Sequence, residues 1–295
     1  MPFIDRLNQT ASATNNRLCQ LLAEKTHLSE YLDESITYSV TDGGKRLRSY
    51  LVQEFCELCG NNSAYSLDYA CAIEMIHAFS LIHDDLPAMD DDDMRRGKPS
   101  NHKKFGEATA ILAGDSLALD AFFVAGNNIF CSKEQNLDAV LLLSKKSGSL
   151  GMCAGQQTDL DGEGKRLDTS ELLKLVDLKT GALFEASCAL GCIAANVDSD
   201  KIEAAKRFGL LSGRAFQITD DLLDIHSTVE ELGKSIGKDL DQEKSTFVSL
   251  LGEDGAKKYA EECINGAKEA LCIFPDNEAK IRLTEYCDYI LIRSK

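Results

Sequence analysis

The stretch that decides the fold is HDDLPAMDDDDMRRG, residues 83–97. Six aspartates lie within ten residues of it, and Arg95 and Arg96 follow at once. Carboxylates this close raise one another's pKa unless a cation neutralises them, and an all-oxygen ligand set suits a hard ion such as Mg²⁺. Because arginine forks match phosphate oxygens, the stretch indicates a diphosphate–Mg²⁺ site. A solvated acidic loop is the simpler alternative.

A second acidic motif, FQITDDLLD, occupies residues 216–224. On a helix, Asp220 and Asp224 lie about 40° apart around the axis and share a face, whereas Asp221 points elsewhere. An apolar helix that carries aligned acids needs positive charge opposite them. The two acidic segments are therefore expected to face each other across one cavity that holds several metal ions.

Composition limits the classes of partner. The chain has 295 residues, of which 44% are hydrophobic and 27% charged, as in a globular protein with a sizeable core. A formal net charge of -16 argues against nucleic acid and against an anionic membrane surface. It does not exclude an anionic substrate, because bound metal ions reverse the local field. The eleven scattered cysteines are expected to be reduced, mostly buried thiols.

No targeting segment or membrane span is expected. The first residues lack a signal core and transit character. Residues 110–126 come closest to an apolar span, but Asp115 and Asp120 interrupt the run, which falls short of the ~20 residues that a bilayer requires. A cytoplasmic protein follows from these patterns.

Apolar residues recur at helical spacing through most of the chain. Helices are expected over residues 3–40, 49–60, 67–85, 107–130, 137–157, 168–191 and 201–226, with a helical remainder to residue 295. No strand alternation, hairpin turn, repeat or composition break stands out. The chain is therefore predicted to be all-α, one large helical bundle in a single domain, 1–295.

Three local features sharpen the prediction. Pro87 should end its helix just after Asp84, so that Asp90 can turn back and share a metal ion with Asp84. Residues 42–48, DGGKRLR, form a glycine turn before a basic helix start, which favours either a bound anion or an exposed basic turn. His77 lies seven residues before Asp84 on nearly the same face, either as a ligand contact or as a structural histidine.

These pieces, in this order, resemble the trans-isoprenyl diphosphate synthases, the polyprenyl synthetase family, and most closely its bacterial short-chain farnesyl diphosphate synthases. The matching stretches are residues 43–48, 77–97, 151–156, 179–183, 216–224, 233–244 and 288–293. Either acidic motif alone is a weak signal, but the series in register is specific. The resemblance implies an isoprenoid synthase-like bundle around a deep central active-site cavity, and a homodimer.

The resemblance also implies a role for each matched residue. Metal ligands would be Asp84, Asp90 and Asp220, holding three Mg²⁺ ions, or Mn²⁺, with Asp221 and Asp224 acting partly through water. Groups that hold the allylic diphosphate would be Arg95, Lys179 and Lys234, helped by Lys244. Groups that hold isopentenyl diphosphate would be Lys45, Arg48, His77 and Arg96. Oxygen lone pairs that steady a carbocation would come from Thr180 and Gln217, which with Lys179 form the implied catalytic set.

The implied reaction is the condensation of isopentenyl diphosphate with dimethylallyl or geranyl diphosphate to farnesyl diphosphate. Breaking an allylic C–O bond leaves pyrophosphate, whose charge metal ions and basic side chains stabilise. Fixed contacts to the diphosphate of isopentenyl diphosphate aim the double bond of that substrate at the allylic cation. A dry cavity protects the cation from water, and the departing pyrophosphate accepts the proton.

Product length is expected to depend on Phe79, five residues before Asp84, where farnesyl-forming relatives carry an aromatic ring. A ring there would block chains longer than fifteen carbons, unless Phe79 is an ordinary core residue. The alternatives are a geranylgeranyl diphosphate synthase and a non-catalytic regulatory subunit of a heteromeric synthase. A terpene cyclase would have no use for Lys45 and Arg48. One departure from the family's pattern is Ser49, because relatives often carry proline at this position. The serine is expected to loosen the helix start.

Overall fold

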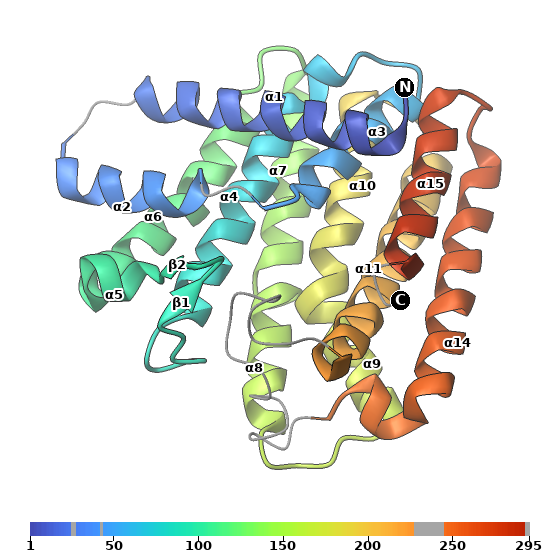
Figure 1. Ribbon diagram of the computed structural model, residues 1–295. Coiled ribbons are helices and arrows are strands. Elements are labelled where there is room, and N and C mark those ends of the chain that lie inside the picture. The colour runs from blue at the N-terminus through green and yellow to red at the C-terminus, as the bar shows by residue number, and fades with distance from the viewer. Residues whose placement is uncertain (25–27, 42–43, 227–244, 293–295) are drawn as a thin grey trace.

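The computed structural model describes residues 1–24, 28–41, 44–226 and 245–292 and shows a helical bundle (Figure 1). The long helices are α1 (Phe3–Ala23), α2 (Glu30–Val40), α3 (Leu47–Leu58), α4 (Leu67–Asp84), α6 (Glu107–Gly126), α7 (Lys133–Ser147), α8 (Met152–Gly162), α10 (Ala182–Ala194), α11 (Ser199–His226), α14 (Phe247–Ala270) and α15 (Glu278–Ile292). The shorter ones are η1 (Ser63–Ser66), α5 (Asn101–Phe105), α9 (Thr169–Val176), η2 (Asp177–Gly181) and η3 (Leu271–Ile273). The all-α prediction is confirmed.

A small hairpin is the one exception to the helical pattern in the described residues. Strands β1 (Met94–Arg95) and β2 (Lys98–Pro99) pair antiparallel, with Arg95 opposite Lys98. The turn residues Arg96 and Gly97 both have positive φ, 53° and 76°, which suits the twist of a two-residue hairpin turn. The expectation of no hairpin was wrong here, because two residues per strand are too few to show alternation.

Two expected helices are each divided in two. The predicted helix 3–40 is α1 followed by α2, and α2 begins at Glu30 after its N-cap residue Ser29, whose side chain accepts a hydrogen bond from the amide of Leu32. The predicted helix 137–157 ends as α7 at Ser147 and resumes as α8 at Met152. At Gly151, between them, a Cβ atom would lie 2.0 Å from the carbonyl oxygen of Lys146, so only glycine allows this close approach.

The central helices are buried on nearly every side. α4 and α10 carry mostly apolar residues around their whole circumference, as expected of helices inside a large bundle. α10 contacts α3, α4, α7 and α11, while α1 lies across one end of the bundle and contacts α3 and α4 (Figure 1). All eleven cysteines are free thiols.

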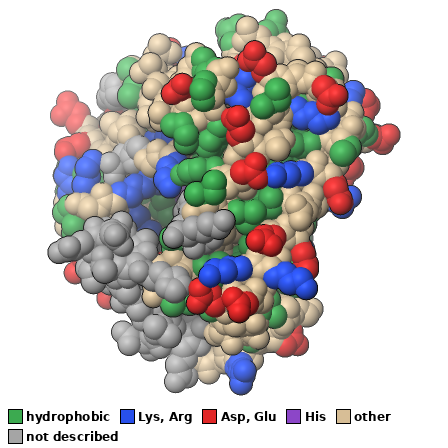
Figure 2. Space-filling model, turned by 45° about the vertical axis from the view of Figure 1, so that its right-hand side comes forward, with side chains coloured by type: hydrophobic (Ala, Val, Ile, Leu, Met, Phe, Trp, Pro, Cys, Tyr) green, Lys and Arg blue, Asp and Glu red, His purple; other side chains and the backbone are tan. Residues whose placement is uncertain are grey.

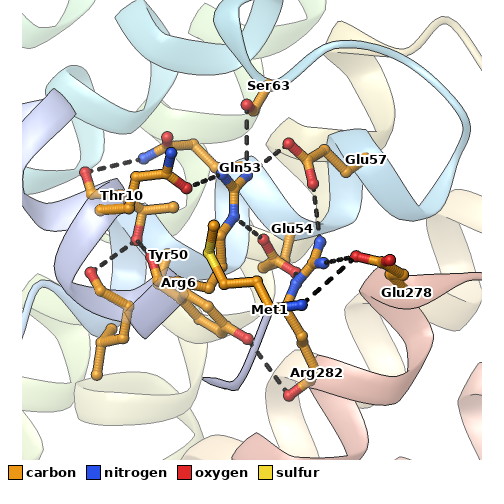
Figure 3. Close-up of polar contacts among 12 residues, drawn as sticks. Met1, Arg6, Thr10, Tyr50, Gln53, Glu54, Glu57, Ser63, Glu278 and Arg282 are labelled. Atoms are coloured by element: carbon orange, nitrogen blue, oxygen red, sulfur yellow. Dashed lines mark hydrogen bonds and ion pairs between the residues drawn. The ribbon is translucent and has the colours of Figure 1, made fainter. Parts of the chain in front are cut away.

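A buried ion-pair network joins α1, α3 and α15 (Figure 3). Glu54 on α3 lies 2.7 Å from Arg6 of α1 and 2.7 Å from Arg282 of α15, and its side chain is completely buried. Burial raises the pKa of Glu54, although the two arginines oppose the shift. Glu57 accepts from the same two arginines. The network therefore fastens both ends of the described chain to α3, at a desolvation cost that its paired charges offset.

Charge and apolar surface are distributed unevenly. Figure 2 shows acidic and basic side chains intermixed on the face that includes α14 and α15. Within the described residues, α6 alone is long and apolar enough to cross a membrane by length and composition, and 39% of its most apolar window is buried. The helix packs against α4 and carries Asp115 and Asp120. Leu119 and Phe123 on it are 71% and 70% exposed.

Candidate active site

The two acidic motifs line one cavity of about 730 Å³. Asp84 and Asp90 reach it from the end of α4 and the following loop, and Asp220 and Asp224 reach it from α11. The expectation that the two segments face one hollow is thus met by the geometry. Further predicted site residues on the wall are Arg48, His77, Phe79, Arg95, Lys179, Thr180 and Gln217.

The loop after α4 turns back on itself at Pro87. The helix ends at Asp84, with Asp85 as its C-cap. The amide of Asp90 then donates a 2.8 Å hydrogen bond to the carbonyl oxygen of Asp84. This turn brings Asp90 beside Asp84, as the position of Pro87 predicts.

The carboxylate of Asp84 is held in an unfavourable environment. Burial raises its pKa to about 7, Asp90 adds to the increase, and Lys179 opposes it. A divalent cation between these oxygens would remove the cost of ionising Asp84. The donors are all carboxylate oxygens, which fits a hard ion that completes its shell with substrate phosphates.

Asp85 has a different partner. Its side chain is 3% exposed, and Arg95 donates from Nε to its two carboxylate oxygens at 3.0 and 3.3 Å and also from Nη2. Asp85 stands next to the predicted metal ligand Asp84, but its carboxylate is paired with Arg95. Asp85 therefore orients a guanidinium at the cavity wall.

Lys179 lies in the π-helical turn η2, a local distortion common at functional sites. Its ammonium group lies 2.5 Å from the carboxylate of Asp159 on α8. Burial lowers the pKa of Lys179, but Asp159 outweighs that effect and the net shift is upward, so the group is cationic. Gly155 allows this approach, because a Cβ atom there would lie 2.2 Å from the Lys179 amide nitrogen.

Asp159 was missed by sequence reasoning. It lines the cavity and pairs with Lys179, 20 residues further along the chain. Its only signal is its place at the polar end of an apolar run, which does not reveal a partner.

A chain of hydrogen bonds fixes the predicted carbocation site. The hydroxyl of Thr180 donates to Gln217 Oε1 at 3.0 Å, and Gln217 Nε2 donates to Asp221 Oδ1 at 3.0 Å. Asp221 Oδ2 in turn accepts from the amide of Phe247 at 3.0 Å. Asp221 thus also holds the start of α14. By accepting from Gln217 Nε2, it orients the Gln217 amide so that the oxygen points toward Thr180.

Arg48 and His77 form a basic wall from α3 and α4. Arg48 Nε has no hydrogen-bond partner among the described residues, and the guanidinium lies 5.0 Å from the Phe184 ring. Burial lowers the pKa of Arg48. Burial and then nearby arginines lower the pKa of His77, so its imidazole is neutral near pH 7. A buried guanidinium that lacks such a bond is suited to receive an anion.

Four predicted residues are not on the cavity wall as described. Lys45 is exposed, with its ammonium group 5.4 Å from the Tyr289 ring. Arg96 lines a small neighbouring pocket of about 30 Å³ and lies beside Gly44. Lys234 and Lys244 fall outside the described residues.

A separate acidic cluster lies near the hairpin. Ligand atoms of Asp91, Asp93 and His102 lie within 4.8 Å of one another, the one such group of three found in the described part of the chain. Lys103 already lies 2.7 Å from Asp93. The predicted ligands Asp84, Asp90 and Asp220 do not form such a group among the described residues.

Together the fold and the cavity define the isoprenyl diphosphate synthase fold, a helical bundle with two acidic motifs facing basic side chains. The family model for polyprenyl synthetase matches residues 29–271. The chain belongs to this family of short-chain trans-prenyltransferases, which use Mg²⁺ with diphosphate substrates.

Similar proteins carry two different product names. The chain is 43% identical to farnesyl diphosphate synthase of Micrococcus luteus over 95% of this chain and 96% of that one. It is 44% identical to geranylgeranyl diphosphate synthase of Cyanophora paradoxa over 90% and 88% of the two chains. The structure of geranyltransferase from Helicobacter pylori complexed with magnesium and isoprenyl diphosphate matches with a TM-score of 0.82 and 29% identity, over 99% of this chain and 97% of that one.

Proposed function

We propose that the protein is a (2E,6E)-farnesyl diphosphate synthase that joins isopentenyl diphosphate to dimethylallyl or geranyl diphosphate. The observation that carries the proposal is that Asp84 and Asp220, from two distant acidic motifs, line one cavity together with basic side chains. Prenyl transfer follows from family membership, whereas the fifteen-carbon product is the finer proposal.

The allylic diphosphate would bind between the acidic motifs. Bound Mg²⁺, in three ions, would neutralise charge on the leaving pyrophosphate. Asp84, Asp90 and Asp220 would hold the ions, and Lys179 and Arg95 would donate to the phosphate oxygens. In the free protein the two basic side chains already have acidic partners: Lys179 pairs with Asp159, and Arg95 pairs with Asp85. These partners keep both side chains at the cavity wall, in the position that the phosphate needs.

Isopentenyl diphosphate would bind at the basic wall. Arg48 and neutral His77 would donate to its phosphates, and Lys45 and Arg96 would approach from the rim. Anchoring the diphosphate here directs the double bond toward the allylic carbon. Lys234 and Lys244 are proposed as further diphosphate contacts on the resemblance of their motif alone.

The centre of the cavity would receive the carbocation. Thr180 and Gln217 are joined by a hydrogen bond, and each side-chain oxygen still has a lone pair. The fixed network would direct these lone pairs toward the carbocation. Apolar wall residues such as Leu175 and Leu183 exclude water, which would otherwise quench the cation. The departing pyrophosphate would accept the proton, so no dedicated side-chain base is needed.

Phe79 supports the fifteen-carbon product. Its ring lies on the cavity wall, one turn before the end of α4, and packs edge-on against His83 with centroids 5.7 Å apart. Gly114 of α6 backs His83, since a Cβ atom there would lie 2.2 Å from His83 Nε2. The Phe79 ring thus has a neighbouring ring on the cavity wall that is itself packed against α6, which limits its movement.

A geranylgeranyl diphosphate synthase is the second candidate, because relatives of equal similarity carry that name. A non-catalytic subunit is disfavoured, because neither acidic motif lacks an aspartate. We also propose one domain over residues 1–295 and a cytoplasmic homodimer. The exposed apolar side chains of α6 and α7, including Leu119, Phe123 and Leu141, would be covered by the second copy.

Product analysis tests the proposal. Purified protein is incubated with labelled isopentenyl diphosphate, dimethylallyl diphosphate and Mg²⁺, and the dephosphorylated products are separated by chain length. A main product of fifteen carbons is expected. A twenty-carbon product would overturn the length assignment, and no elongation by the purified chain would favour the regulatory subunit.

A further inference from the structure

Arg46 and Glu74 form a buried ion pair that no step of the reaction uses. Their side chains are each 3% exposed, and Arg46 Nη1 lies 2.9 Å from Glu74 Oε2. Arg46 stands at the start of α3, and Glu74 lies in the middle of α4, 28 residues away. Two fully desolvated charges are costly unless every polar atom finds a partner.

Glu74 completes the start of α3. The N-cap residue of α3 is Arg46, which makes no side-chain cap hydrogen bond. Instead Glu74 Oε1 accepts a 3.0 Å hydrogen bond from the amide of Ser49, in the first turn of the helix. A carboxylate here satisfies an otherwise unpaired helix N–H and complements the helix dipole. Ser49 has the amide hydrogen that proline lacks, and this bond to Glu74 opposes the loosening expected of serine at the helix start.

The Arg46 side chain hydrogen-bonds to α1, to the end of α2 and to α4. Its Nη2 donates to the carbonyl oxygen of Val40 at 2.5 Å, and its Nε donates to Asn15 Oδ1 at 3.0 Å. Its backbone adopts a left-handed conformation with φ of 51°, which is uncommon outside glycine and needs support from its surroundings. The bonds of its guanidinium provide that support.

The pair joins the two chain segments that bear the basic groups of the cavity wall. Arg46 precedes Arg48 by two residues, and Glu74 precedes His77 by one helical turn on the same face. Arg46, Glu74 and His77 also line the pocket of about 30 Å³ next to the cavity. The pair therefore fixes the α3 segment that bears Arg48 against the α4 segment that bears His77.

We propose that Arg46 and Glu74 are positioning residues, which set the separation of Arg48 and His77 and thereby build the site for the isopentenyl diphosphate without touching it. The inference rests on the proposed function of Arg48 and His77. A purely structural pair would affect both substrates through stability, whereas a positioning pair affects the one diphosphate that these two groups hold.

The test compares Glu74→Gln and Arg46→Lys with the parent protein. Each variant keeps much of the shape but loses the charge or the multidentate fork. The KM for isopentenyl diphosphate is expected to rise about 10- to 100-fold, by analogy with the loss when hydrogen-bond partners of metal ligands are changed. The KM for the allylic diphosphate is expected to stay nearly unchanged. Equal changes in both KM values would overturn the proposal.

A matched control is Glu54→Gln, in the equally buried network of Figure 3. It is expected to lower Tm as much as Glu74→Gln does, while leaving the ratio of the two KM values unchanged. If the control shifts that ratio equally, loss of stability explains the effect and the positioning role is contradicted. Measurements well below each Tm remove partial unfolding as a cause.

A double-mutant cycle with Arg48→Gln shows whether Glu74 acts through Arg48. We expect Glu74→Gln to have little further effect on isopentenyl diphosphate binding once Arg48 is replaced, since coupled residues are not additive. Additive losses would contradict the proposal. Calorimetric binding of isopentenyl diphosphate distinguishes failure of the proposed function from failure of the positioning role. A parent protein that does not bind isopentenyl diphosphate refutes the proposed function. If the parent and the Glu74→Gln variant bind it equally well, only the positioning role is refuted.

Discussion

The amide of Asp90 donates a 2.8 Å hydrogen bond to the carbonyl oxygen of Asp84, so the chain reverses at the end of α4 and presents two carboxylates to one cavity. The reversal depends on Pro87, which cannot continue the helix. Two carboxylates that are six residues apart in sequence thereby become neighbours.

Replacing Asp84 should remove activity without unfolding the protein. Asp84→Ala is expected to lower kcat by about 10³-fold, because a group that stabilises the charge of the leaving pyrophosphate is lost. Steady-state kinetics and the helical circular dichroism spectrum provide the check. Asp254→Ala, at an exposed position of α14, is the control, and near-normal turnover of Asp84→Ala would refute the metal assignment.

Metal–diphosphate binding should depend on pH through Asp84. Burial, and next Asp90, raise its pKa to about 7 in the protein without metal. The carboxyl must lose its proton before it ligates an ion, so the affinity for Mg²⁺ and inorganic pyrophosphate should increase from about pH 6 to about pH 8, with proton release at the lower pH. Calorimetry in buffers of different ionisation enthalpy measures that release, and pH-independent binding without it would contradict the assignment.

The same shift predicts a stability effect in the metal-free protein. An aspartate in the unfolded chain titrates near 3.9, so the raised folded value means that Asp84 contributes stability at low pH that is lost as pH rises through about 7. Asp84→Asn cannot ionise and should raise Tm relative to the parent at about pH 8, with the gap narrowing as pH falls below about 7 and closing only near pH 4. A gap that does not change with pH would mean that Asp84 is not the group responsible.

Lys179 should act mainly on the allylic substrate. Lys179→Gln removes the cation at the π-helical turn and is expected to raise the KM for the allylic diphosphate by about tenfold or more, with a smaller effect on isopentenyl diphosphate. Kinetics with each substrate varied in turn measure the difference. Lys174→Gln, on the exposed side of α9, is the control, and a larger effect on isopentenyl diphosphate would reverse the assignment.

Phe79→Ala should lengthen the product. Removing the ring opens space beside His83, so we expect a shift from fifteen-carbon toward twenty-carbon chains in the chromatogram of dephosphorylated products. Phe122→Ala is the matched control, because Phe122 packs against the same apolar core cluster but does not line the cavity. Unchanged fifteen-carbon output from Phe79→Ala would show that another group sets the length.

Much of this architecture can be predicted from local pattern. Helical spacing places Asp220 and Asp224 on one face, and both line the cavity. The predicted helix start at residue 168 is also found, where Asp168 and Glu171 form a capping box. These features depend on residues a few positions apart, for which the geometry of the helix is known in advance.

The pairs that organise the site could not be predicted in this way. Arg46 meets Glu74, and Lys179 meets Asp159, across helices that are 28 and 20 residues apart in sequence. Helical periodicity shows which face of each helix is apolar, but the direction in which two helices pack decides which charges meet. The split of residues 3–40 into two helices escaped notice for a related reason, since apolar spacing continues on both sides of the break.

The central claim is that both acidic motifs bind one diphosphate through shared metal ions. The most direct test is calorimetric binding of inorganic pyrophosphate with Mg²⁺ to the parent protein, Asp84→Asn, Asp220→Asn and the double variant. We predict that either single change removes most of the affinity and that the double variant loses little more, because each motif alone cannot hold the bridged ligand. Independent, additive losses, or tight binding that survives either change, would contradict the account.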